Sequence, residues 1–132
     1  LNAKYTSTLL HFTAYETKDT KGQPLQTPSA EDQTAFTKLN SQGSIPFTLY
    51  GGTGYDIGAT YDESLLMTQG SFMQDKTAAE INSALADPKS EIAQAVLGSA
   101  NIKTAYLCTL TGGKPAAVCT SPGVKAAAAK LP

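Results

Sequence analysis

The sequence predicts a single domain of mixed helix and strand, of the α/β or α+β class. The chain has 132 residues, the size of one domain, and 41% of them are hydrophobic, an ordinary share for a globular protein. The stretch SIPFTLYGGTGYDIGATY places two β-prone runs on either side of a glycine-rich turn. Capping signals followed by apolar residues at helical spacing mark several other segments.

The first segments predict one strand and one helix. Residues 5–15, from Tyr5 to Tyr15, are rich in β-branched and aromatic residues, which is typical of a strand. A turn-rich connection with glycine and proline follows. Ser29 and Asp32 then form a capping signal, which predicts a helix from about Ala30 to Asn40.

The glycine-rich stretch could be a phosphate-binding loop or the turn of a β-hairpin. A dinucleotide-binding loop would open a long helix at once, but the residues after Gly54 are β-prone and no Walker lysine follows. We therefore expect two strands, IPFTLY and YDIGATY, joined by residues 51–54. Pro46 should lie at a strand start or edge, and a cis Ile45–Pro46 bond is one way to accommodate it.

The segments after the hairpin predict helices. A short helix is expected from Asp62, and Thr77 with Glu80 forms a capping box for the helix AAEINSALA. A longer helix is expected from Pro88, capped by Asp87, to about residue 111.

The long helix and the chain end complete the prediction. The face of the long helix should carry a stripe that includes Val96, Ser99, Ile102 or Lys103, and Tyr106. A glycine pair at 112–113 ends that helix. Residues 120–132 have little to bury and are expected to be a flexible tail or linker.

Charge and composition exclude some functions. The ten basic residues are all Lys, and the net charge is −1. Because Arg is the preferred residue for bidentate contacts with phosphate and guanine, its absence argues against nucleic-acid binding.

Composition also bears on the location of the protein. A surface rich in Thr, Ser, Gln and Asn is common outside the cytoplasm. No apolar run reaches the roughly 18 residues of a membrane span. Leu1 stands in place of Met, without a signal-peptide core, so we expect a processed chain or a piece of a longer one.

The two cysteines, Cys108 and Cys119, are expected to pair. Their spacing does not fit a redox Cys-x-x-Cys motif or a structural zinc site. The glycine pair between them can turn the chain so that the sulfurs meet. Two buried free thiols are the alternative. A disulfide would contribute about 3 kcal/mol and would indicate an oxidising compartment.

Other polar residues give no catalytic or metal-binding pattern. His11 is the single histidine, and a hydrogen-bonded structural role on a strand is the expectation for it. Asp56, Asp62 and Glu63 lack the spacing of a calcium loop and are explained by strand and cap positions. No metal or cofactor is therefore expected. Three tyrosines could line a surface groove, although hairpin packing is the default: Tyr50, Tyr55 and Tyr61.

The order of these segments resembles the second half of a thioredoxin-like domain. More closely, the chain from about Tyr5 to Cys119 resembles an uncharacterised thioredoxin-like family of archaea and actinobacteria. The matching motifs are HFTAYETKDTKGQPLQTPSAEDQ, GSIPF, GATYDESLL, AAEINSALADPKSEIAQAVLGSAN and LCTLTGGKPAAVC.

The resemblance implies an incomplete thioredoxin-like fold over residues 1–119, followed by the tail. Ile45 and Pro46 would form its cis-proline loop, and Cys108 with Cys119 would match a second, structural cysteine pair. The family carries its Cys-x-x-Cys motif on an upstream strand and helix that have no counterpart here. The strand missing with that motif would lie between the strand at residues 5–15 and the first hairpin strand.

The expectation is therefore an extracytoplasmic or secreted structural or binding module without a redox motif of its own. One alternative is the C-terminal part of a thiol-disulfide oxidoreductase whose active cysteines lie upstream. Another is a subunit of a cell-surface assembly or an accessory subunit of a membrane complex. By itself the chain is not expected to be an enzyme. Its sheet would be completed by a protein partner, an upstream segment or a neighbouring copy.

Overall fold

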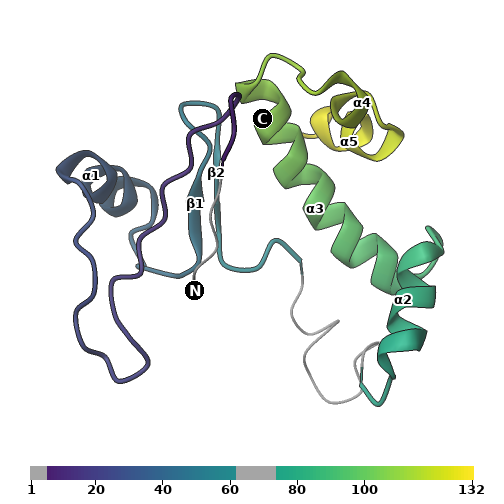
Figure 1. Ribbon diagram of the computed structural model, residues 1–132, viewed down its shortest axis with the longest axis horizontal. Coiled ribbons are helices and arrows are strands. Elements are labelled where there is room, and N and C mark those ends of the chain that lie inside the picture. The colour runs from purple at the N-terminus through teal and green to yellow at the C-terminus, as the bar shows by residue number, and fades with distance from the viewer. Residues whose placement is uncertain (1–5, 62–73) are drawn as a thin grey trace.

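A computed structural model describes residues 6–61 and 74–132 and shows an α+β protein with a small antiparallel sheet (Figure 1). The expected helix at Asp62 lies outside the described residues. We call residues 6–61 the hairpin half and residues 74–132 the helical half. Figure 1 shows the hairpin between helix α1 on one side and the long helix α3 on the other.

The hairpin half begins with an open segment. The sequence predicts a strand at residues 5–15, but residues 6–15 form none, and this prediction is wrong for the described residues. A β-prone segment becomes a strand only where a partner strand accepts its backbone hydrogen bonds, and the two-stranded sheet does not include it. Helix α1, Ala30–Leu39, is confirmed, with the Ser29 hydroxyl accepting from the Asp32 backbone N–H.

The predicted hairpin is confirmed. Strand β1, Phe47–Leu49, pairs with β2, Tyr55–Ile57, in antiparallel register with Thr48 opposite Asp56. The buried Asn40 side chain holds the approach to β1, because its amide donates to the Ser44 carbonyl at 2.6 Å and its oxygen accepts from the Ser44 N–H.

The helical half consists of four helices. Helix α2, Ala78–Ala86, has the predicted Thr77 capping box, and α3 spans Glu91–Leu110. The predicted start of α3 at Pro88 is three residues early, because Ser90 is the N-cap that accepts from the backbone of Ala93. The Asp87 N–H instead closes the end of α2 on the Ala84 carbonyl.

The chain end is helical and packed. The short helix α4, Ala116–Cys119, is followed by α5, Pro122–Ala128. Of the two, α5 lies within residues 120–132, which were expected to form a flexible tail. Val124 and Ala127 of α5 are buried against Ala105 of α3 in the main apolar cluster. Val124 and Ala127, one helical turn apart, and the partly buried Leu131 belong to this cluster, contrary to the expectation that the chain end has little to bury.

Candidate functional site

The long helix α3 meets the hairpin through a polar and aromatic face. Ser99, Lys103 and Tyr106 follow one another at spacings of four and three residues, which places them on one side of the helix. Another side of α3 contacts α5. It carries the buried Ala105 and its partly buried neighbours Ile102 and Cys108. The expected single stripe on α3 is thus two faces, and Lys103 belongs to the one that contacts the hairpin.

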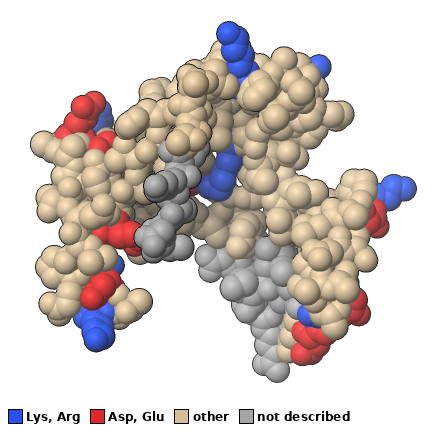
Figure 2. Space-filling view, viewed as in Figure 1, with Lys and Arg blue, Asp and Glu red and all other residues tan. Residues whose placement is uncertain are grey.

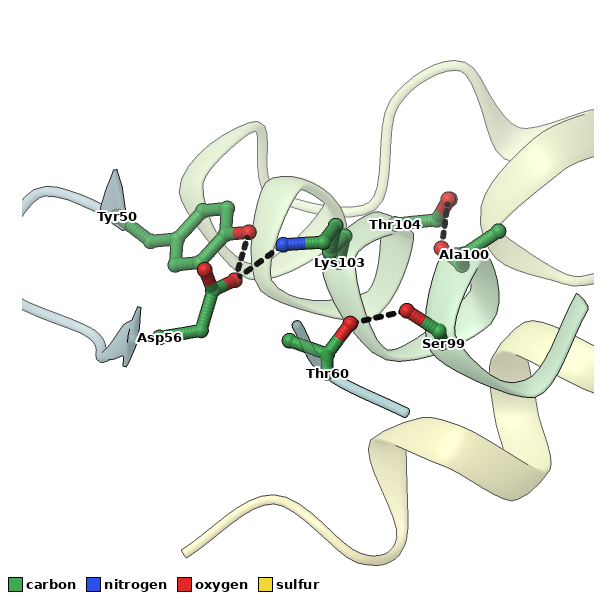
Figure 3. A network of polar contacts seen from close by, with 7 residues as sticks. All are labelled: Tyr50, Asp56, Thr60, Ser99, Ala100, Lys103 and Thr104. Atoms are coloured by element: carbon green, nitrogen blue, oxygen red, sulfur yellow. Dashed lines mark hydrogen bonds and ion pairs between the residues drawn. The ribbon is translucent and has the colours of Figure 1, made fainter. Parts of the chain in front are cut away.

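Asp56 is the centre of this contact (Figure 3). Its Oδ2 atom accepts from the Tyr50 hydroxyl at 2.6 Å and lies 2.7 Å from the Lys103 Nζ atom. The Asp56 side chain is 10% exposed, whereas that of Lys103 is 38% exposed. The other carboxylate oxygen, Oδ1, is buried without a hydrogen-bond partner in the described part of the chain. We call Tyr50, Asp56 and Lys103 the polar latch, because they join the hairpin to α3.

Aromatic packing reinforces the polar latch. The Tyr50 ring stacks on Tyr106 with centroids 4.8 Å apart and planes inclined by 10°. A side chain at Gly54 would run into the Tyr106 ring, so the turn must carry glycine there for the two to approach. Further along, the Thr60 and Ser99 hydroxyls are hydrogen-bonded to each other.

The polar latch keeps Tyr50 protonated. Burial and, after it, the hydrogen bond to the Asp56 carboxylate raise the pKa of the Tyr50 phenol well above its ordinary value. A phenol with a raised pKa keeps its proton, donates it in a hydrogen bond and is a poor acid. The Asp56 carboxylate and the Lys103 ammonium carry opposite charges and form an ion pair across this contact.

The predicted cis-proline pair lies at the foot of the hairpin. The Ile45–Pro46 bond is cis, as is Lys114–Pro115, which the sequence did not predict. Ile45 is 80% exposed, and the Pro46 carbonyl accepts from the Gly58 N–H just before β1 begins. Correspondence with the cis-proline loop of thioredoxins stays a prediction.

The predicted disulfide joins Cys108 of α3 to Cys119 of α4, with Cα atoms 5.6 Å apart. Figure 1 places the end of α3 at the turn end of the hairpin and the start of β1 at its other end, so the disulfide and Pro46 do not form one site. Both cysteines of the chain are used in this bond.

Other features of the described residues add no reactive centre. Residues 6–61 and 74–132 hold no group of acidic, histidine or cysteine side chains arranged for a metal ion. His11 is exposed and its Nε2 atom contacts the Thr13 hydroxyl at 3.2 Å. No helix in these ranges has the length and hydropathy needed to cross a membrane.

The second face of the hairpin is apolar and largely uncovered. Side chains alternate along a strand, so Tyr50 and Asp56 point to α3 while Phe47 and Leu49 point the other way. Phe36 of α1 packs edge-on against Phe47 at 5.3 Å between centroids. The other apolar side chains on this face stay exposed: Leu49, Tyr55 and Ile57.

The fold and these contacts define a small, disulfide-bonded α+β domain with one uncovered hairpin face. Comparison of the sequence and structure with protein-family models, curated proteins and solved structures finds no match.

Proposed function

We infer that this chain is an extracytoplasmic, thioredoxin-like module with a structural or binding role and no redox motif of its own. The observation that carries the binding role is the open two-stranded sheet, with exposed apolar side chains on one face and no third strand among the described residues. Exposed strand edges accept further strands from other chains or segments.

The backbone pattern identifies the groups available for such pairing. Tyr50 donates to the Gly54 carbonyl and Gly58 donates to the Pro46 carbonyl, so these pairs bond across the hairpin. In an antiparallel ladder the intervening residues of β1, Phe47 and Leu49, point their N–H and C=O groups outward. Figure 1 draws β1 on the side of the hairpin toward α1 and β2 on the side toward α3.

The disulfide supports the location and the lack of redox chemistry. Disulfides persist in oxidising compartments such as the extracellular space. Because Cys108 and Cys119 are bonded to each other across two packed helices, they serve to hold α4 against α3. A thiol exchange catalyst needs a low-pKa, accessible thiolate, and the two cysteines of the chain, Cys108 and Cys119, lack the Cys-x-x-Cys spacing typical of such catalysts.

The binding role is tested by panning the immobilised full chain against a library of random extended peptides. We expect wild type to enrich uncharged sequences with alternating apolar residues. Leu49→Pro should lose this enrichment, because proline removes the outward N–H and is tolerated on an edge strand. Leu49→Ala keeps that N–H and is the matched control. Equal enrichment by wild type and Leu49→Pro, or none by either, would contradict the proposal.

The non-enzymatic role is tested separately by insulin reduction. The chain should give the background rate with dithiothreitol as reductant, and the double variant Cys108→Ala, Cys119→Ala should give the same rate. A wild-type rate well above that of the double variant would show that the Cys108–Cys119 pair exchanges disulfides.

A further inference from the structure

The positive and negative charges of this chain are separated along the sequence. Residues 92–132 hold four of the ten Lys and none of the eleven acidic residues, which gives them a net charge of +4. Residues 1–91 hold the other six Lys and all the acidic residues, a net charge of −5. On the face that Figure 2 shows, the blue side chains over α4 and α5 have no red beside them, whereas the red ones gather on the α1 and α2 sides. A negatively charged partner would therefore be attracted to the α4–α5 end of the molecule.

Three of these four lysines are available to a partner. Lys103 is paired with Asp56 in the polar latch. The other three are exposed, and the structure gives them no ion pair with a described residue: Lys114, Lys125 and Lys130. We call these three lysines the basic corner, because α4 and α5 lie together at one corner of the molecule (Figure 1).

The basic corner stands on an ordered backbone. The Thr111 hydroxyl accepts from the Lys114 N–H at 3.2 Å and donates to the Lys114 carbonyl at 2.6 Å. The N–H groups of Lys125 and Lys130 donate to carbonyls of the preceding turn at 3.0 and 2.9 Å. Because Lys125 directly follows the buried Val124, its side chain lies on the side of α5 away from α3. The three charges are therefore presented together with little further ordering of the chain.

Apolar side chains are exposed in the same part of the molecule. Val118, on α4 between Lys114 and Lys125 in the sequence, is 46% exposed, and two leucines of the last turn of α3, Leu107 and Leu110, are also exposed. Lysines beside exposed apolar side chains suit the headgroup region of a bilayer, where the charges meet anionic lipids and the apolar groups leave water.

We propose that the basic corner binds the surface of a bilayer that contains anionic phospholipids. The absence of Arg favours this partner, because Lys acts as a point charge and suits many dispersed headgroups, whereas Arg suits planar, bidentate contacts. The acidic residues of residues 1–91 would be repelled by the same surface, so the chain would bind it in one orientation. This inference goes beyond the proposed peptide-binding role of the hairpin and does not depend on it.

Sedimentation of the full chain with lipid vesicles tests the proposal. Vesicles of equal parts phosphatidylglycerol and phosphatidylcholine are negatively charged, and vesicles of phosphatidylcholine alone have no net charge. One lysine near an anionic bilayer contributes about fivefold in affinity, so the wild-type chain should bind the charged vesicles about a hundredfold more tightly than the neutral ones. Salt at about 1 M shortens the Debye length to about 3 Å and should remove most of this preference.

Two triple variants separate the basic corner from the net charge of the chain. The first replaces the basic corner: Lys114→Gln, Lys125→Gln and Lys130→Gln. The control replaces three exposed lysines of the hairpin half: Lys18→Gln, Lys21→Gln and Lys38→Gln. Both change the net charge equally, but only the first should lose the preference for charged vesicles. Arginine at the three positions of the basic corner keeps the charge and should keep the preference. Circular dichroism of all variants should match wild type, because the replaced side chains are exposed.

Four outcomes would overturn the inference. Two are equal binding of the wild-type chain to both kinds of vesicle and an equal loss of binding in the two triple variants. The third is binding of soluble polyglutamate, but not of charged vesicles, through the basic corner, which would point to an acidic protein. The fourth is self-association at low salt through the same lysines, without binding to charged vesicles, which would pair the basic corner with the acidic part of a second copy. Peptide capture by the hairpin should be the same in wild type and in the first triple variant, so either proposal can fail without the other.

Discussion

The hairpin half and the helical half of this protein use apolar residues in different ways. In the helical half, Val124, Ala127 and Ala105 are buried together beside the disulfide. In the hairpin half, Tyr50 is buried while Leu49 and Tyr55 remain exposed on the opposite face of the same strands. The difference indicates that the helical half supplies most of the stability. The hairpin, which the polar latch joins to α3, leaves an apolar face exposed to solvent.

The largest expected effect is loss of the disulfide. The double variant Cys108→Ala, Cys119→Ala should lose about 3 kcal/mol of unfolding free energy. The bond joins residues 11 apart in sequence and so restricts the conformations open to the unfolded chain between them. Urea denaturation measures the loss. A double variant as stable as wild type would show that the helical half does not depend on this bond.

The next effect tests whether the chain end belongs to the core. Val124→Ala removes two methyl groups from a buried position and should cost about 2 kcal/mol. Val118→Ala on α4 is the matched control. The Val118 side chain is 46% exposed, so its truncation should change stability little. Equal effects of the two substitutions would mean that α5 is not docked on α3.

A smaller effect tests the polar latch between the two halves. Lys103→Met removes one of the two donors to Asp56 and should cost about 1 kcal/mol, since Lys103 is partly exposed and its ion pair is weakened by solvent. In a double-mutant cycle with Tyr50→Phe, the two losses should not add, because both side chains donate to the same oxygen. Additive losses would contradict a shared latch.

The smallest effect is a dependence of stability on alkaline pH. The raised pKa of Tyr50 means that the folded chain keeps a proton which the unfolded chain releases above about pH 10. The contribution of Tyr50 to the free energy of unfolding is fully present below that pH and should decrease as the pH rises further. Tyr50→Phe should remove this component from the pH profile, while Tyr55→Phe, on the exposed face, should not.

Local sequence signals predicted the local elements well. The Ser29 cap, the Thr77 capping box and the glycine turn of the hairpin each depend on residues close in sequence, and the structure has all three. The start of α3 was misplaced because Asp87 and Ser90 are both good caps, and the choice depends on how α2 ends.

Tertiary features were beyond the sequence. Asp56 and Lys103 are 47 residues apart, and the pair forms only because the hairpin docks on one face of α3. The sequence offered one signal for this contact: the helical spacing allowed either Ile102 or Lys103 on the inward face of α3, and Lys103 is the residue that pairs with Asp56. The strand expected at residues 5–15 depended on a partner strand, and propensity alone does not supply one. The docking of α5 was missed because its buried side chains, Val124 and Ala127, are few and small.

Residue-resolved amide hydrogen exchange of the dilute chain tests the central claim, that β1 is an open edge on a folded support. The Leu49 and Phe47 amides should exchange rapidly, because they point outward, while the adjacent Tyr50 amide, bonded to Gly54 at 2.8 Å, should be protected. Amides in the middle of α3 should be protected most strongly. Protection of Leu49 equal to that of Tyr50 in the dilute chain would contradict the claim, because the edge would then already be covered.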